Sequence, residues 1–124
     1  MLARALRSSC LLQLHASAWR AKTTTGLVGL EVLDNGREEL MAASRRILNA
    51  VQSIPEDAVY RRNLEKIYSH RLHVCEQSES VEQVEATLQE GQIEELVKIA
   101  NDEENLIPVM KRMLRLLMPS LSCS

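Results

Sequence analysis

The stretch KTTTGLVGLEV, residues 22–32, separates two parts of the chain that differ in charge and hydropathy. The residues before it carry three arginines and no acid, whereas all seventeen acidic residues follow Thr25. The stretch itself is rich in β-branched and aliphatic side chains, which favour extended backbone. Gly26 and Gly29 would weaken a free strand, so we expect residues 22–34 to form an extended arm that lies against a neighbouring surface. An ordinary linker with some apolar residues is the alternative.

Residues 1–21 have the composition of a mitochondrial transit peptide. Arg4, Arg7 and Arg20 are interspersed with serines, and the first acid is Glu31. A secretory signal would have a longer apolar core than the one found here. We therefore predict cleavage close to Ala21, the alternative being a surface helix that stays on the protein. The remaining chain has twelve basic and seventeen acidic residues, a formal net charge of −5.

This charge and the hydropathy pattern narrow the function classes. Nucleic-acid binding depends on clustered Lys and Arg at phosphates, which an acidic chain does not supply. A basic protein surface is a more suitable partner. No apolar run approaches the eighteen residues that a membrane-spanning helix needs, so we expect no direct membrane span.

Helical periodicity follows the boundary stretch. The predicted first helix begins after the turn signal at residues 34–36, and Ser53 to Glu56, at capping-box spacing, close it and open the second. A short helix starts at Ser80, and a longer one starts at Ile93, which Pro108 should kink or end unless it restarts beyond. The predicted apolar stripes are Leu40, Ile47, Leu48, Val51 and Ile54 in the first helix; Val59, Tyr60, Leu64, Ile67, Tyr68, Leu72, Val74 and Cys75 in the second; and Ile93, Leu96, Val97, Ala100, Leu106 and Ile107 in the last. Arg61, Arg62, Glu65 and Lys66 are placed on the solvent face.

The predicted fold class is all-α. We expect a small antiparallel three-helix bundle plus one short helix over residues 35–113, preceded by the arm and the transit peptide. The chain contains no phenylalanine, so the core must be built mainly from aliphatic side chains. Residues 114–124 form a C-terminal tail.

Few side chains have the spacing of a chemical site. His70, His73 and Cys75 are the only clustered metal-ligand types, and three are too few for a structural zinc site, so we expect no metal. The three cysteines, Cys10, Cys75 and Cys123, show no paired spacing and are interpreted as free thiols. Adjacent acids at residues 94–95 and 102–104 point apart on a helix, which indicates a solvated or partner-facing surface rather than a catalytic pair.

The boundary stretch also resembles a known family. KTTTGLVGLEV is similar to the opening of the alpha subcomplex subunit 5 family, an accessory subunit of mitochondrial respiratory complex I (NADH:ubiquinone oxidoreductase). Further similar pieces follow in the same order, at residues 54–61, 88–95 and 104–110. After Met110 the family usually continues into a segment with tryptophan and proline, whereas this chain reads KRMLRLLMPS. The contacts of the family's tail are therefore not transferred.

The resemblance implies a non-catalytic subunit without a cofactor or a small-molecule substrate. It implies a peripheral position on the matrix side of the mitochondrial inner membrane, with other complex I subunits of the peripheral arm as partners and a role in assembly or stability. The candidate partner interface is Thr25, Gly26, Leu27, Val28, Gly29 and Leu30. The alternative function is a small mitochondrial adaptor or assembly factor of the LYR type, because Val59-Tyr60-Arg61 is close to Leu-Tyr-Arg. The acidic charge and the internal position of that triplet disfavour this alternative.

Overall fold

The computed structural model describes residues 24–117, which contain four α-helices and no β-strand. The helices are α2 (Gly36–Ala50), α3 (Val59–Gln77), α4 (Val81–Leu88) and α5 (Ile93–Leu117), and a short 3₁₀ helix η1 (Val51–Ser53) follows α2. This confirms the predicted all-α class. The predicted transit peptide lies outside the described residues. Contacts divide the chain between Val32 and Leu33, and the helices all belong to the second unit.

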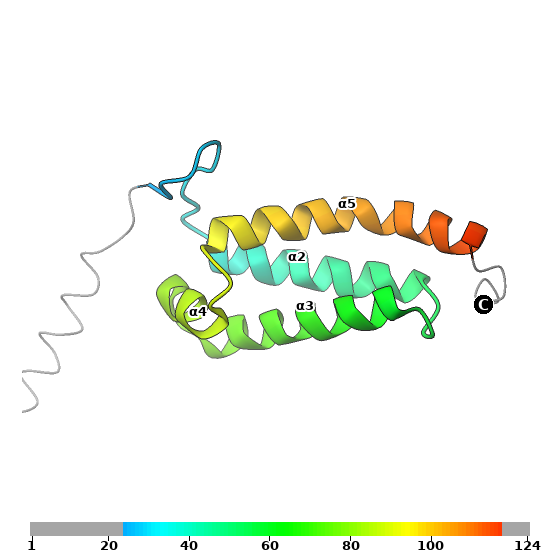
Figure 1. The fold of residues 1–124 in the computed structure, drawn as a ribbon. Helices are drawn as coiled ribbons and strands as arrows, with labels where there is room; N and C mark the ends of the chain where they lie inside the picture. Colours follow the sequence, from blue (N-terminus) through cyan, green and yellow to red (C-terminus); the bar gives the residue numbers. More distant parts are fainter. Residues whose placement is uncertain (1–23, 118–124) are drawn as a thin grey trace, which may run out of the picture. The chain divides into compact units, whose positions relative to one another are not determined.

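Helix α2 lies against both α3 and α5 (Figure 1). Near the start of α2, the Arg37 Nε donates to the Cys75 carbonyl near the end of α3 at 2.9 Å. Further along α2, the Arg46 Nε lies 2.9 Å from the Glu104 carboxylate in the middle of α5. Helix α3 therefore runs opposite to α2, whereas α5 runs in the same direction as α2 (Figure 1).

The core consists mainly of aliphatic side chains from the four helices, η1 and the connection that follows it, as expected for a chain without phenylalanine. Most of the predicted stripe residues are buried, among them Leu40, Ile47, Val51 and Ile54 from the first stripe and Leu64, Tyr68, Val74 and Cys75 from the second. Val59, Ile67 and Leu106 were placed on stripes but are exposed. In α3 the reason is a rotation of the helix, because Arg61 and Arg71 occupy part of its inner face.

Of the two serines predicted to cap helix starts, the structure confirms only one. Ser80 caps α4 as predicted, since its hydroxyl accepts the Gln83 backbone N–H at 3.3 Å. The predicted cap at Ser53 is wrong. The Ser53 hydroxyl instead donates to the Ala50 carbonyl behind it at 2.8 Å, and α3 begins only at Val59. A hydroxyl that satisfies the end of the preceding helix is not available to start the next one.

Helix α5 runs without interruption from Ile93 to Leu117 and contains Pro108. Proline lacks the N–H that would bond four residues back, and it usually kinks or ends a helix. The buried residues of α5, such as Ala100 and Ile107, all precede the proline, and beyond it the partly buried Leu114 still packs against the core. The expected end or restart at Pro108 is therefore not seen, and the helix extends beyond residue 113.

Candidate partner-interaction site

The predicted interface residues, Thr25 to Leu30, fold into one closed loop. The Thr25 hydroxyl donates to the Leu30 carbonyl at 2.8 Å, and its oxygen accepts the Leu27 N–H at 3.2 Å. The Leu30 N–H in turn reaches the Leu27 carbonyl at 3.4 Å. Gly26 and Gly29 have φ angles of +71° and +78°, a conformation that other residues rarely adopt. The expectation of extended backbone is wrong for these six residues, because the Thr25 hydroxyl and the two glycines close a turn.

The loop presents apolar side chains at its surface. Thr25 is buried, whereas the Val28 side chain is fully exposed and Leu27 is 39% exposed. An isolated exposed valine is common on protein surfaces. Here it stands on a loop whose shape is fixed by a buried threonine, so the position of the apolar tip within the loop is defined. These residues can supply an apolar contact to a partner, and they carry no group for catalysis.

Directly after Val32, the chain enters the helical unit at a tightly packed corner. The Leu33 N–H donates to the Glu94 Oε1 at 3.3 Å, and Glu94 is only 1% exposed. Its expected place on a solvated surface is wrong. A carboxylate in the first turn of a helix is favoured by the helix dipole, and the backbone N–H compensates for its burial. At the same corner, a Cβ added to Gly36 would lie 2.8 Å from the Ile93 Cγ2.

Arg61 holds the connection between α2 and α3. It was expected on the solvent face, but the residue is 8% exposed. Its Nη1 donates to the Ile54 carbonyl at 2.6 Å, its Nη2 to the Gln52 Oε1 at 2.8 Å and its Nε to the Glu65 carboxylate at 2.8 Å. The planar guanidinium suits three acceptors in different directions, which explains an arginine at a buried position. The sequence signal for it was the position of Arg61 on the same helical face as Leu64 and Tyr68.

A second buried arginine connects α3 to the segment after α4. The Arg71 Nε and Nη2 each lie 2.9 Å from the Glu90 carboxylate, and the guanidinium lies 5.1 Å from the centre of the Tyr68 ring. Burial raises the pKa of Tyr68, and the positive charge of Arg71 opposes that shift. The Arg71 Nη1 is buried and has no hydrogen-bond partner in the part of the chain that the structure describes. These contacts fix the end of α3 relative to α4.

The candidate metal ligands are not brought together. His70 and His73 are exposed on α3, whereas Cys75 is completely buried. Within residues 24–117 no group of three or more potential metal ligands occurs. Burial raises the pKa of the Cys75 thiol, which disfavours the thiolate that a metal would need. Cys10 and Cys123 lie outside the described residues.

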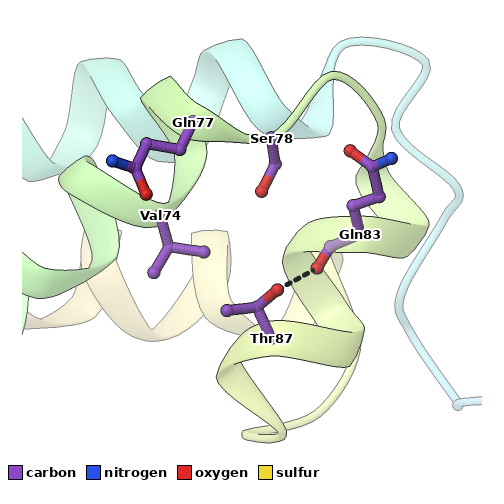
Figure 2. A pocket seen from close by; sticks show the side chains of 5 residues that line it. All are labelled: Val74, Gln77, Ser78, Gln83 and Thr87. Atoms are coloured by element: carbon purple, nitrogen blue, oxygen red, sulfur yellow. Dashed lines mark hydrogen bonds between the residues drawn. The ribbon is translucent and has the colours of Figure 1, made fainter.

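A pocket of about 300 Å³ lies between the end of α3 and α4 (Figure 2). Its lining residues offer one aliphatic side chain, two amides and two hydroxyls, from Val74, Gln77, Ser78, Gln83 and Thr87. The Thr87 hydroxyl already donates to the Gln83 carbonyl at 2.7 Å (Figure 2). Such groups can form neutral hydrogen bonds, but they are poor general acids or bases near neutral pH.

The comparisons with known proteins decide the family. Residues 29–95 match the family model described as the ETC complex I subunit conserved region. This chain belongs to that family. The match begins inside the Thr25–Leu30 loop and ends in the first turn of α5, so it includes the buried Arg61 and Arg71.

Two relatives named as complex I subunits are similar to this chain over more than two thirds of its length. The probable NADH dehydrogenase (ubiquinone) 1 alpha subcomplex subunit 5, mitochondrial, of Arabidopsis thaliana is 42% identical over 91 residues, which are 73% of this chain and 54% of that protein. NADH dehydrogenase (ubiquinone) 1 alpha subcomplex subunit 5 of Bos taurus is 39% identical over 85 residues, 68% of this chain and 73% of the bovine protein. The chain thus spans about half the length of the plant relative.

The family assignment confirms the resemblance and gives no support to the LYR-type alternative. The structure supplies a physical reason for the near match at that triplet. Tyr60 donates a hydrogen bond to Glu103 on α5, and Arg61 holds the α2–α3 connection, so both side chains serve internal contacts. Among residues 24–117, no helix combines the length and the apolar character that crossing a membrane would require.

Proposed function

We propose that this chain is a non-catalytic accessory subunit of mitochondrial respiratory complex I, peripheral on the matrix side of the inner membrane. The family match over residues 29–95 carries the proposal, because the relatives in that family are named as subunits of NADH dehydrogenase (ubiquinone). The described side chains agree with a structural role. The buried side chains of Arg61, Arg71 and Glu94 bind backbone groups and side chains of neighbouring segments, which stabilises the fold.

The partners in this proposal are other complex I subunits of the peripheral arm, and the role is to support assembly or stability of the complex. The helices α2, α3 and α5 act as a small three-helix bundle, and the loop at Thr25–Leu30 is available to a neighbouring subunit. The exposed tip, Val28 with Leu27, is the proposed contact. Residues 1–21 serve as the transit peptide, and we expect the mature protein to begin near Lys22.

The decisive experiment for complex I membership is native electrophoresis of solubilised mitochondrial membranes. Co-migration of this chain with NADH dehydrogenase activity is the expected result. A small species without that activity would contradict the proposal and favour a free adaptor. Amino-terminal sequencing of the co-migrating protein tests the transit peptide, and an intact Met1 terminus would contradict cleavage.

The loop contact needs a separate test with a matched control. Val28→Asp places a charge at the exposed loop tip, and Val59→Asp places the same charge at an exposed valine that begins α3. Both variants should unfold at nearly the wild-type denaturant concentration, because neither valine is in the core. Val28→Asp should reduce incorporation into the complex, whereas Val59→Asp should assemble normally. Equal incorporation of the two variants would contradict the proposal that the loop contacts a neighbouring subunit.

A further inference from the structure

Helix α5 carries a second apolar stripe on the side that does not face the core. Ile99, Leu106 and Met113 recur every seven residues, and Val109 and Leu116 each follow three residues later. All five side chains are at least 40% exposed. This is the a/d spacing of a helix that packs against another helix over its length. We call these five residues the α5 seam.

The α5 seam lies outside the conserved region that matches the family model. That region ends at residue 95, before the first seam residue. The core stripe of the same helix, with Ala100 and Ile107, is fully used by packing inside the unit. The α5 seam is therefore a surface that the internal packing of the described residues does not cover.

Charges along the α5 seam have opposite signs at its two ends. Asp102 occupies the seam position between Ile99 and Leu106, where the repeat would otherwise place an apolar residue. Its carboxylate pairs with Lys98 at 2.9 Å, and both side chains are more than 60% exposed. Beyond Val109, Arg112 and Arg115 are exposed, and neither forms an ion pair within the described part of the chain. The first half of the seam therefore carries an acid, Asp102, and the second half is flanked by the basic residues Arg112 and Arg115.

This polarity makes the α5 seam complementary to itself in the reversed direction. If Leu106 of one copy faces Val109 of another, each Asp102 comes within about one residue rise, ~1.5 Å along the axis, of the level of Arg112 across the seam. A parallel pairing would instead place the two Asp102 carboxylates opposite each other, which is unfavourable. In a two-fold symmetric dimer the contact between Asp102 and Arg112 occurs two times, once from each copy.

We infer that the α5 seam is a self-association surface, on which the free chain pairs with a second copy through antiparallel α5 helices. The contact is small, because five side chains from each copy fall short of the roughly 1,200–2,000 Å² that stable complexes bury. The dimer is therefore weak and depends on protein concentration. A surface of this kind protects the free chain from other hydrophobic contacts and can exchange its second copy for a different helix.

Sedimentation velocity of the full chain over a range from about 1 μM to about 1 mM tests this inference. The expected result is a monomer at the lowest concentration and a dimer at the highest. Leu106→Glu should give a monomer throughout the range, with the helical circular dichroism of the wild type, because Leu106 is exposed. A monomer of the unmodified chain at every concentration would overturn the inference and leave the seam to another occupant.

Charge reversal tests the antiparallel geometry. Asp102→Arg and Arg112→Asp should each weaken the dimer at least about tenfold, since each places like charges across the seam. The double variant exchanges the two signs and should restore most of the affinity. Arg62→Asp, an exposed reversal on α3, is the control and should leave it unchanged. Antiparallel pairing would be contradicted if neither single reversal changed the affinity of the dimer, or if the double variant did not recover it. None of these outcomes depends on incorporation into complex I.

Discussion

The Tyr60 hydroxyl donates a hydrogen bond to the Glu103 carboxylate, which connects the first turn of α3 to the middle of α5. The two helices otherwise meet mainly through α2, which lies against both of them. Burial raises the pKa of Tyr60, and the hydrogen bond to Glu103 and its negative charge raise it further. The protonated phenol is therefore the form that the folded chain favours.

Tyr60→Phe should lower the free energy of unfolding at neutral pH by about 1–2 kcal/mol, because it removes a hydrogen bond to a charged group and leaves the ring in place. Urea unfolding of the purified chain measures the loss. Glu103→Gln is the matched control, since the amide oxygen can still accept the bond, and it should cost less. A Tyr60→Phe variant as stable as the wild type would mean that the bond contributes nothing.

The same contact predicts a pH dependence. The folded pKa of Tyr60 lies above its ordinary value of 10.0. Above that pH the unfolded chain loses a proton that the folded chain still holds, so stability falls as the pH rises further. Below pH 10 this contribution is fully present. In Tyr60→Phe the fall should be smaller, which unfolding curves from about pH 8 to about pH 11 would reveal. Parallel curves for the two proteins would contradict the assignment.

Arg61→Met should destabilise the chain by about 2–4 kcal/mol, because it leaves the buried Ile54 carbonyl without its donor. Arg61→Lys should recover little, since an ammonium group cannot reach three acceptors in different directions. The control is Arg62→Met on the adjacent, exposed position, for which we expect a change within about 0.5 kcal/mol. Thermal and urea unfolding provide the comparison. Full rescue by lysine would show that only the charge matters.

Ile47→Ala should lower the free energy of unfolding by about 2–5 kcal/mol, because Ile47 on α2 is completely buried in the core. Ile67→Ala deletes the same atoms from a side chain that is 41% exposed on α3, and it should cost much less. Denaturant unfolding of both variants, analysed with the same dependence of free energy on denaturant concentration, gives the two losses in stability for comparison. Similar losses for the two variants would mean that the core has been assigned to the wrong face.

Gly36→Ala should destabilise the chain by about 1–3 kcal/mol, since the new Cβ would meet the Ile93 side chain at 2.8 Å. In an open helix the same change would be stabilising, so the sign of the effect is the test. The second variant is Gly36→Ala combined with Ile93→Ala, in which the space is free. If the clash is the cause, the loss in the double variant should be smaller than the sum of the two single losses.

The helices could be predicted from the sequence because their apolar residues recur with helical period, and the core positions of α2 followed directly. The buried charges could not. Arg61 and Glu94 are typical surface residues, and their burial depends on acceptors and donors that other segments supply, Ile54 for the one and Leu33 for the other. The Thr25–Leu30 loop was misinterpreted for a similar reason. Its composition favours strands, but one hydroxyl and two glycines with positive φ close it. The direction of α5 relative to α2 is also a tertiary property that no local signal carries.

The central position of α2 sets an order for folding. Helix α2 and helix α3 are close in the sequence and can pair as soon as both exist, whereas the contacts of α2 with α5 join residues such as Arg46 and Glu104, 58 positions apart. Closing so long a segment is slow relative to local pairing. The side of α2 that packs against α5 therefore stays uncovered until the last helix has formed. A chain that enters a compartment amino terminus first would pass through this half-covered state every time, and that interval is when it most needs a chaperone.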